Sequence, residues 1–477
     1  MIVDDAPNNS GFSSFGCITA QNETTIAVNP TNPNNLIAGS NDYRVCCDFD
    51  GLNDGTGWAY YSFAGRQTWH NVQLPELTAE TLGKGTFKRV DSAGDPVVTF
   101  SPDGVAYYAN IVFSRDTPAS GVAVSTSLDG GQTWSAPNLV TYNDAGNFFS
   151  DKEWIAAGAN GKVVVKWTRF NQGPHGAGYL SSPIVGAISN DYGHTWNRQG
   201  FPISDNAHPF NQGSQVQFAT LYVAYEGSSP TTGYATDAMV LARSADDGHS
   251  FTTVELARVY DDFDCYPIYA GRQTLTDMHF RLNSYPAMSV DPSTGAIAIA
   301  WSDNQGSGNC GTGQASFSGT TSNQVKLIRG TWPAIAAAPV VHVTTTTQDK
   351  VFPSVAANNG KIAVSYYTRD YGIALTTTIC NVQTNNVASG IAPIPTARSV
   401  CIDYASKSLA DNFAAETRLS TQSSNPFIQF ADGSFIGDYS QLAIGTDGNA
   451  HAAWTDFRGN PGVTSANQDV VVQTFIP

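Results

Sequence analysis

The stretch SYPAMSVDPSTGAIAIAW, residues 284–301, decides the fold that the sequence predicts. It holds two short runs in which apolar and polar residues alternate, joined by a turn that contains Gly295, and this pattern is typical of a β-hairpin. Similar phrases recur along the chain roughly 60 to 85 residues apart, so one copy marks one structural repeat. The seven copies begin at Asn22, Gly94, Asp151, Gln212, Ser284, Val351 and Gly437.

Seven such hairpins predict a closed ring of sheets. Radial repetition of four-stranded blades buries each blade against the next and hides most sheet edges. We therefore predict an all-β fold, a seven-bladed β-propeller of four-stranded antiparallel blades, with six blades as the alternative. Only about one strand follows the last hairpin. This predicts that a strand near residues 15–19 closes the ring and that residues 1–477 form a single domain.

Composition favours strands and excludes some partners. The chain has 44 Gly, 20 Tyr and 24 Phe but only 4 Met, which favours strands and turns over helices. Its net charge of -16 repels phosphate backbones and anionic lipids, and it has no apolar run of about 20 residues that would cross a bilayer. We therefore expect no nucleic acid and no membrane as partners, and we expect a monomer.

The cysteines bear on the cellular compartment. Seven cysteines show no CxxC spacing of the kind that binds zinc, and several of them are spaced to pair across loops. The expected pairs are Cys265 with Cys310, Cys380 with Cys401, and Cys17 with Cys46 or Cys47, which leaves one cysteine over. Such pairing favours a secreted, extracellular protein. The first ten residues lack the features of a secretory signal, so the chain is either cytosolic or a mature form with an added Met1.

Three segments share the pattern Ser-x-Asp-x-Gly-x-Thr/Ser-Trp/Phe. They are Ser127 to Trp134, Ser189 to Trp196 and Ser244 to Phe251. Their Asp side chain is placed to accept backbone N–H groups across a turn, their Gly permits a positive φ, and their aromatic ring is placed to pack between blades. The pattern predicts a structural turn.

This pattern resembles the Asp box of sialidases and other proteins with bacterial neuraminidase repeats. The resemblance implies a β-propeller and an extracellular carbohydrate-active protein, often an exo-glycosidase. The chain lacks the Phe-Arg-Ile-Pro or Tyr-Arg-Ile-Pro motif that true sialidases carry before the first box, and those enzymes have six blades. Sialic acid is therefore not identified as the substrate.

Arginine recurs where the second predicted strand ends in five of the seven blades. The loops at that end of a propeller converge on its axis. Because a guanidinium binds a carboxylate through two hydrogen bonds, arginines gathered there suit an acidic sugar. The alternative is that each arginine pairs with a neighbouring aspartate. The predicted substrate-binding residues are Arg44, Arg169, Arg369, Arg458, Tyr367 and His208.

Carboxylates for catalysis are available at the same end. A glycosidase needs one protonated and one ionised carboxyl group beside the bond it cleaves. The starts of the inner strands contribute Glu23, Asp95, Asp151, Lys152, Glu153, Tyr285, Asp438 and Tyr439. From these and from the strand ends, the predicted catalytic residues are Glu226, Asp303, Asp456, Tyr439 and Glu153. By analogy with sialidases, Tyr439 or Tyr367 activated by Glu226 is an alternative nucleophile.

The function predicted from these features is that of a sialidase-like glycoside hydrolase that acts on an oligo- or polysaccharide with acidic sugars or branches. One alternative is a polysaccharide lyase that cleaves uronate-containing glycans by β-elimination, for which His208, His279 or a tyrosine would take the proton. A carbohydrate-binding propeller without turnover is the other alternative.

One segment suggests a metal. The run from Asp48 through Asp50 to Asp54 brings four oxygen side chains close together and partly matches the start of a calcium loop, although the terminal Glu of an EF-hand is missing. The alternative is a solvated turn. We expect no required cofactor and, at most, a structural calcium ion at Asp48, Asp50 and Asp54.

Overall fold

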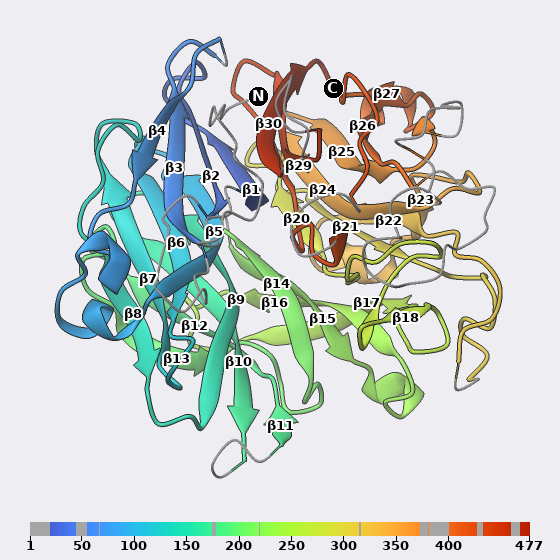
Figure 1. Cartoon of the computed structure of the whole chain (residues 1–477), viewed down its shortest axis with the longest axis horizontal. Helices are drawn as coiled ribbons and strands as arrows, with labels where there is room; N and C mark the ends of the chain where they lie inside the picture. The colour runs from blue at the N-terminus through green and yellow to red at the C-terminus, as the bar shows by residue number, and fades with distance from the viewer. Residues whose placement is uncertain are drawn as a thin grey trace, which may run out of the picture.

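The strands form a ring of sheets around one axis (Figure 1). The computed structural model describes residues 20–43, 55–65, 67–173, 178–218, 220–313, 316–372, 380, 400–426, 433–458 and 468–477. The predicted all-β, seven-bladed β-propeller is confirmed, and the alternative of six blades is wrong. In the described part of the chain, no helix has both the length and the apolar character needed to cross a membrane.

The first four blades follow one another along the chain, each starting at its innermost strand. Blade 1 has β1 (Gln21–Val28), β2 (Leu36–Asp42), β3 (Thr56–Ser62) and β4 (His70–Gln73). Blade 2 has β5 (Ser92–Phe100), β6 (Ala106–Phe113), β7 (Ser120–Ser127) and β8 (Asn138–Asn143). Blade 3 has β9 (Phe148–Ala157), β10 (Val163–Gln172), β12 (Ile184–Ser189) and β13 (Asn197–Pro202), with β11 (Tyr179–Ser181) added beside β10. Blade 4 has β14 (Asn211–Gln217), β15 (Leu221–Ser228), β16 (Asp237–Ser244) and β17 (Thr252–Val259).

The remaining blades repeat this plan after a small hairpin, β18 (Ile268–Tyr269) with β19 (Arg272–Gln273). Blade 5 has β20 (Ala287–Val290), β21 (Ile297–Asp303), β22 (Gln324–Gly330) and β23 (Val341–His342). Blade 6 has β24 (Lys350–Asn358), β25 (Lys361–Thr368), β26 (Asp403–Ser408) and β27 (Thr417–Arg418). Blade 7 has β28 (Gln441–Ile444), β29 (Ala450–Asp456) and β30 (Asp469–Phe475).

Short 3-10 helices lie between some of these strands. They are η1 (Ala79–Thr81), η2 (Gly85–Arg89), η4 (Pro230–Thr232), η5 (Ala334–Ala337) and η10 (Leu409–Asp411).

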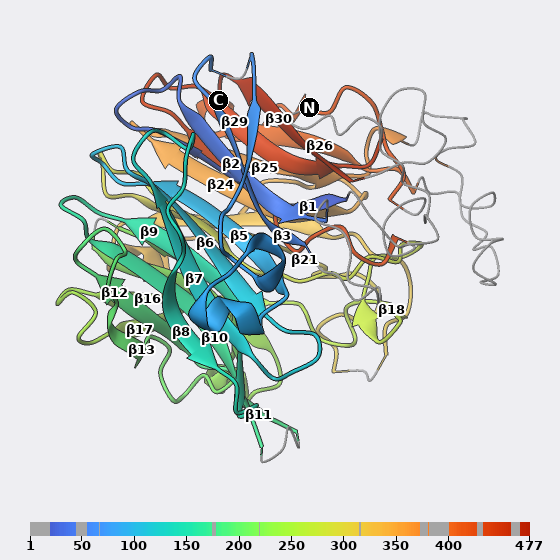
Figure 2. The same ribbon diagram turned by 60° about the vertical axis from the view of Figure 1, so that its left-hand side comes forward.

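The ring closes between blades 7 and 1. Each inner strand contacts the inner strand of the next blade, and β28 contacts β1. The backbone N–H of Gln21 donates to the carbonyl oxygen of Gln468 at 2.7 Å, and β1 and β30 lie side by side in Figures 1 and 2. The closing strand expected near residues 15–19 lies outside the described residues and stays a prediction.

Five of the inner strands carry a bulge near their start, and these bulges shape the centre of the ring. The register shifts at the bulge in β1, β5, β9, β14 and β24. At the bulge the backbone has a positive φ, which residues other than glycine rarely adopt. A bulge redirects the side chains that follow it. The positive-φ residues are Glu23, Asp95, Lys152, Gly213 and Phe352.

The three Ser-x-Asp-x-Gly segments that resemble Asp boxes are turns that join the third and fourth strands of blades 2, 3 and 4. In the first, Asp129 accepts hydrogen bonds from the backbone N–H of Thr133 at 2.9 Å, from its hydroxyl at 2.6 Å and from the Ser127 hydroxyl at 2.8 Å. Gly131 has a φ of 95°. Trp134 packs edge-on against Tyr108, with 5.7 Å between ring centroids. These turns lie at the end of the blades opposite the bulges.

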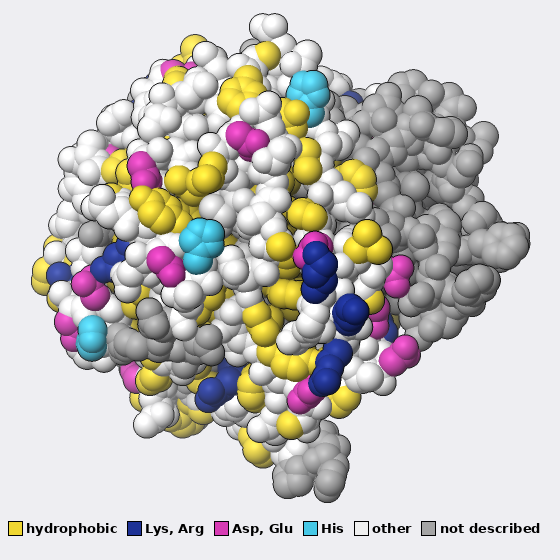
Figure 3. All heavy atoms as spheres, turned by 90° about the vertical axis from the view of Figure 1, so that its left-hand side faces the viewer, with side chains coloured by type: hydrophobic (Ala, Val, Ile, Leu, Met, Phe, Trp, Pro, Cys, Tyr) yellow, Lys and Arg dark blue, Asp and Glu magenta, His cyan; other side chains and the backbone are white. Residues whose placement is uncertain are grey.

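Two of the expected disulfides are present, Cys265–Cys310 and Cys380–Cys401. The expected pairing of Cys17 with Cys46 or Cys47 lies outside the described residues. On the face in Figure 3, acidic and basic side chains are interspersed and most of the described surface is uncharged, as a chain with 13% charged residues requires.

Candidate active site on the propeller axis

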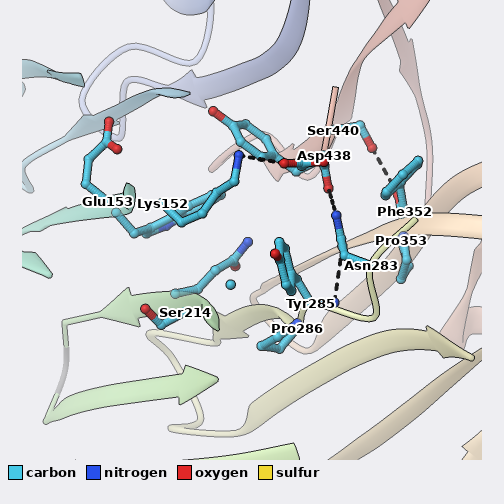
Figure 4. A pocket seen from close by; sticks show the side chains of 14 residues that line it. Lys152, Glu153, Ser214, Asn283, Tyr285, Pro286, Phe352, Pro353, Asp438 and Ser440 are labelled. Atoms are coloured by element: carbon cyan, nitrogen blue, oxygen red, sulfur yellow. Dashed lines mark hydrogen bonds and ion pairs between the residues drawn. The ribbon is translucent and has the colours of Figure 1, made fainter. Parts of the chain in front are cut away.

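Lys152 is the centre of a buried ionic cluster on the axis. Its Nζ lies 2.7 Å from Asp95 Oδ2, 2.7 Å from Asp438 Oδ2 and 3.0 Å from Glu23 Oε1. These four side chains belong to blades 3, 2, 7 and 1, and each is placed near the start of an inner strand. The Lys152 side chain is only 7% exposed. In Figure 4 its ammonium group points at Asp438, whereas Glu153 points away from it.

The carboxyl groups of this cluster differ in acidity. Burial, followed by the charge of Asp95, raises the pKa of Glu23 from 4.5 to about 8, although Lys152 acts in the opposite direction. Burial also raises the pKa of Asp95. Burial would raise the pKa of Asp438 too, but the charges of Lys152 and Arg281 outweigh it and hold that pKa below its ordinary value. At neutral pH, Glu23 is therefore mainly protonated and Asp438 is ionised.

The segment before β20 builds one wall of the site. Arg281 binds both oxygens of Asp438, through Nε at 2.8 Å and through its terminal nitrogen at 2.5 Å. Asn283 donates to the backbone oxygen of Asp438 at 3.2 Å. The ring of Tyr285 lies against Gly213, where an added Cβ would come within 2.0 Å of the ring. A side chain at position 213 would therefore displace Tyr285 from the axis.

Two open pockets flank Arg281. One has a volume of about 460 Å³ and is lined by Asp151, Lys152, Arg272, Arg281, Tyr285 and Asp438, among others. The other has a volume of about 290 Å³ and is lined by Glu23, Tyr43, Asp95, Arg115, Arg281 and Phe435, among others. The carboxyl groups of the cluster thus border spaces that a ligand can enter from solvent.

A third pocket of about 270 Å³ continues from the first along blades 3 and 4. It shares Gln212, Gln273, Asn283 and Tyr285 with that pocket and adds Glu226 and Asp261. At its edge lies a row of aromatic rings. Tyr179 is 5.6 Å from Phe170 and 5.3 Å from Phe210 between ring centroids, and Tyr179 and Phe210 are 50% and 43% exposed.

The structure does not bring the predicted catalytic residues together at one place. Glu226 lines the third pocket, whereas Glu153 and Tyr439 line a narrow cavity on the axis. Asp303 is buried and pairs with Lys326 at 2.6 Å. Asp456 pairs with Arg458 at 2.6 Å. The Tyr439 hydroxyl donates to the backbone oxygen of Pro96 at 2.8 Å.

The predicted substrate-binding residues also lie apart, and none of those described lines the pockets above. Arg369 is 1% exposed and pairs with Asp349 at 2.9 Å. The ion pairs of Arg369 and Arg458 agree with the alternative prediction, in which each arginine binds an aspartate rather than the substrate.

Arg169 lies over the ring of Phe148. His208 lies 2.7 Å from Asp205 and 3.4 Å from Glu255. The Tyr367 hydroxyl bonds to the backbone of Thr455 in the next blade. Arg44, Asp48, Asp50 and Asp54 fall outside the described residues.

Sequence reasoning did not find Arg281 and Asn283. They precede a hairpin in a loop, and no repeat pattern marks that position. The residues predicted at the starts of the inner strands did include Glu23, Asp95, Lys152 and Asp438. The sequence carries no signal, however, that the three carboxyl groups among them meet at the ammonium group of Lys152. Among the described residues, no three His, Cys, Asp or Glu side chains form a group able to hold a metal ion.

Comparisons with known proteins give low similarities. No family model matches the chain, and no curated protein matches it. The solved structures similar to it include the α-L-arabinanase of Penicillium chrysogenum complexed with arabinobiose, with 12% identity, 95% of this chain and 93% of that chain covered, and a TM-score of 0.44.

Two further similar structures carry carbohydrate-related names. The α-L-arabinofuranosidase of Fusarium graminearum has 9% identity, covers 96% of each chain and gives a TM-score of 0.43. The sialidase of Trypanosoma rangeli has 12% identity, with 74% of this chain and 53% of that chain covered, and a TM-score of 0.42. Values this low assign no activity to this chain.

Proposed function

We propose that the protein is a glycoside hydrolase whose acid and base are Glu23 and Asp438. The observation that carries this proposal is that both carboxyl groups contact Lys152 Nζ, while the pKa of Glu23 is raised and that of Asp438 is lowered. A pair of carboxyl groups whose pKa values are moved apart supplies the proton donor and the ionised partner that glycoside hydrolysis needs.

In this proposal, protonated Glu23 donates its proton to the oxygen of the leaving sugar as the glycosidic bond breaks, and ionised Asp438 forms a bond to the anomeric carbon of the other sugar. A water molecule that gives its proton to Glu23 then displaces Asp438 and releases this second sugar. Both carboxyl oxygens lie within 3.0 Å of one nitrogen atom. Their separation is therefore below the roughly 6.5–9.5 Å of inverting enzymes. This favours retention of configuration. A glycan lying across Arg281 reaches the pockets that border both groups.

An acidic sugar fits the charges around these pockets. Arg115 and Arg281 line one pocket, and Arg272 and Arg281 line the other, in a chain with only 24 Lys and Arg residues. A guanidinium binds a sugar carboxylate through two hydrogen bonds. Arg272 is exposed and is therefore open to such a contact. We propose a glycan with acidic sugars as the substrate.

We also propose that the protein acts outside the cell as a monomer. The two disulfides Cys265–Cys310 and Cys380–Cys401 support an oxidising compartment. A propeller closed within one chain needs no partner subunit to cover its sheet edges.

The test is incubation with sialylated, uronate-containing and neutral glycans. Release of reducing ends without absorbance from a conjugated double bond supports hydrolysis, and its loss in Glu23→Gln and Asp438→Asn supports the assigned roles. Glu76→Gln, at a surface ion pair with Lys84, is the matched control and should retain activity. An unsaturated product would show a lyase instead, and binding without any product would show a carbohydrate-binding propeller.

A further inference from the structure

Four buried oxygen atoms line the third pocket. None of them accepts a hydrogen bond from an N–H or hydroxyl group of the described residues. They are Asn211 Oδ1, Gln273 Oε1, Glu226 Oε1 and Asp261 Oδ1. Buried oxygens are nearly always satisfied, because leaving one without a partner costs free energy. Four such atoms on one pocket are all acceptors, so what satisfies them must carry positive charge or donate hydrogen bonds.

The two amide side chains are held with their oxygens free. Asn211 Nδ2 donates to the backbone oxygens of His208 at 2.7 Å and Ser182 at 3.1 Å. Asn211 is only 3% exposed, and an added Cβ at Gly227 would lie 2.5 Å from its Oδ1, which places that oxygen next to the Glu226 segment of β15. Gln273 Nε2 donates to the backbone oxygen of Asp261 at 2.6 Å.

The acidic side chains lack a cationic partner. The carboxyl groups of Glu226 and Asp261 lie within hydrogen-bonding reach of each other, and two carboxyl groups can stay this close only with a proton or a cation between them. Asp237 lines the same pocket. In the described chain, neither Lys nor Arg forms an ion pair with any of these three carboxylates.

We propose that this pocket binds a calcium ion through the carboxylates of Glu226 and Asp261 and the amide oxygens of Asn211 and Gln273. Calcium takes six to eight oxygen ligands from carboxylates, amide carbonyls and water, and it tolerates irregular geometry. The pocket supplies such oxygens and has space for water. Zinc prefers nitrogen and sulfur ligands, which these four side chains do not offer.

Among the described residues, no three His, Cys, Asp or Glu side chains form a group able to hold a metal ion. The proposed ligand set is consistent with this, because two of its four side chains are amides. The four proposed ligands do not include Glu23 or Asp438, so the proposal does not depend on the hydrolase activity.

Titration calorimetry with calcium chloride, on full-length protein first freed of metal with EDTA, tests the proposal. We expect the wild type to bind calcium and Glu226→Gln/Asp261→Asn to bind at least tenfold more weakly. Gln273→Leu, at a less buried position, should also bind more weakly and keeps the test valid if the double variant does not fold. Asp247→Asn, at an exposed ion pair, is the control and should bind as the wild type does.

The segment with Asp48, Asp50 and Asp54 needs its own variant, because it is the calcium site expected from the sequence. We expect calcium binding at the Glu226 site to persist in Asp48→Asn/Asp50→Asn/Asp54→Asn. No heat of binding by the wild type at millimolar calcium, or binding that is lost only in this triple variant, would overturn the proposal. Loss of turnover in Glu226→Gln together with unchanged calcium binding would overturn it as well and would support a catalytic Glu226.

Discussion

Lys152 and Asp438 form an ion pair of 2.7 Å between blades 3 and 7, which are not neighbours in the ring. Two such blades can meet only at the axis, where all inner strands converge. The bulge at Lys152, with a φ of 49°, places its side chain there. The same ammonium group contacts Glu23 of blade 1 and Asp95 of blade 2. Lys152 therefore joins four of the seven blades and sets the charge balance of the candidate active site.

Activity should fall as the pH rises through the pKa of Glu23. Burial raises this pKa to about 8, and the proposed acid works only while it is protonated. We expect kcat/KM on the best substrate of the panel to fall with increasing pH above about 8, approaching a tenfold loss per pH unit. A rate profile between pH 5 and 10 measures this. A profile that stays flat to pH 10 would exclude Glu23 as the acid.

Stability should also report on Glu23. Its pKa is raised on folding, so the folded state holds the proton more tightly than the unfolded state between pH 4.5 and about 8. The contribution of Glu23 to the free energy of unfolding therefore decreases as the pH rises through this window. Glu23→Gln cannot ionise. We expect its stability relative to the wild type to increase from pH 5 to pH 8, as measured by denaturant unfolding, and an unchanged difference would contradict the raised pKa.

Removing the ammonium group should destabilise the fold strongly. Lys152→Met leaves the buried carboxyl groups without their shared cation, and breaking a buried ion pair from one side costs about 3–5 kcal/mol. Lys162→Met is the matched control, because Lys162 pairs with an exposed Asp247 and such surface pairs contribute about 0–1 kcal/mol. Urea unfolding of both variants checks this expectation. Equal losses in both would mean that the axial cluster does not hold the blades together.

The sequence predicts the ring better than it predicts the site, for a physical reason. The hairpin phrase at 284–301 and its copies consist of alternating apolar and polar residues joined by turn residues. These features are local in the sequence, so the number of blades can be predicted from the number of copies. Contacts between blades depend on the bulges at Glu23, Asp95 and Lys152, and alternation alone does not reveal a bulge. Arg369 shows the converse error. Its place at a strand end suggested the axis, but Asp349, a residue of the preceding loop, holds it in a buried pair.

The aromatic row at the third pocket should affect the binding of long glycans more than catalysis. We expect the apolar face of a sugar ring to stack on Tyr179 and Phe210, with a contribution of about 0.5–1.5 kcal/mol, as for a pair of aromatic rings. We expect Tyr179→Ala and Phe210→Ala to raise KM for long glycans about 2- to 10-fold and to leave kcat and the KM of the shortest substrate unchanged. Phe63→Ala, at an exposed ring of blade 1, is the control. An equal effect on short and long substrates would contradict this role.

The Asp-box turn should contribute to stability but not to activity. Asp129 accepts three hydrogen bonds from Thr133 and Ser127 at the end of blade 2 opposite the axial bulges. Because the turn is largely exposed, we expect Asp129→Ala to lower the free energy of unfolding by only about 1 kcal/mol. Its kcat/KM should equal that of the wild type, since no part of the box borders the pockets around Arg281. A folded Asp129→Ala variant with impaired turnover would mean that the box acts on the substrate, and the axial cluster would then not be the whole site.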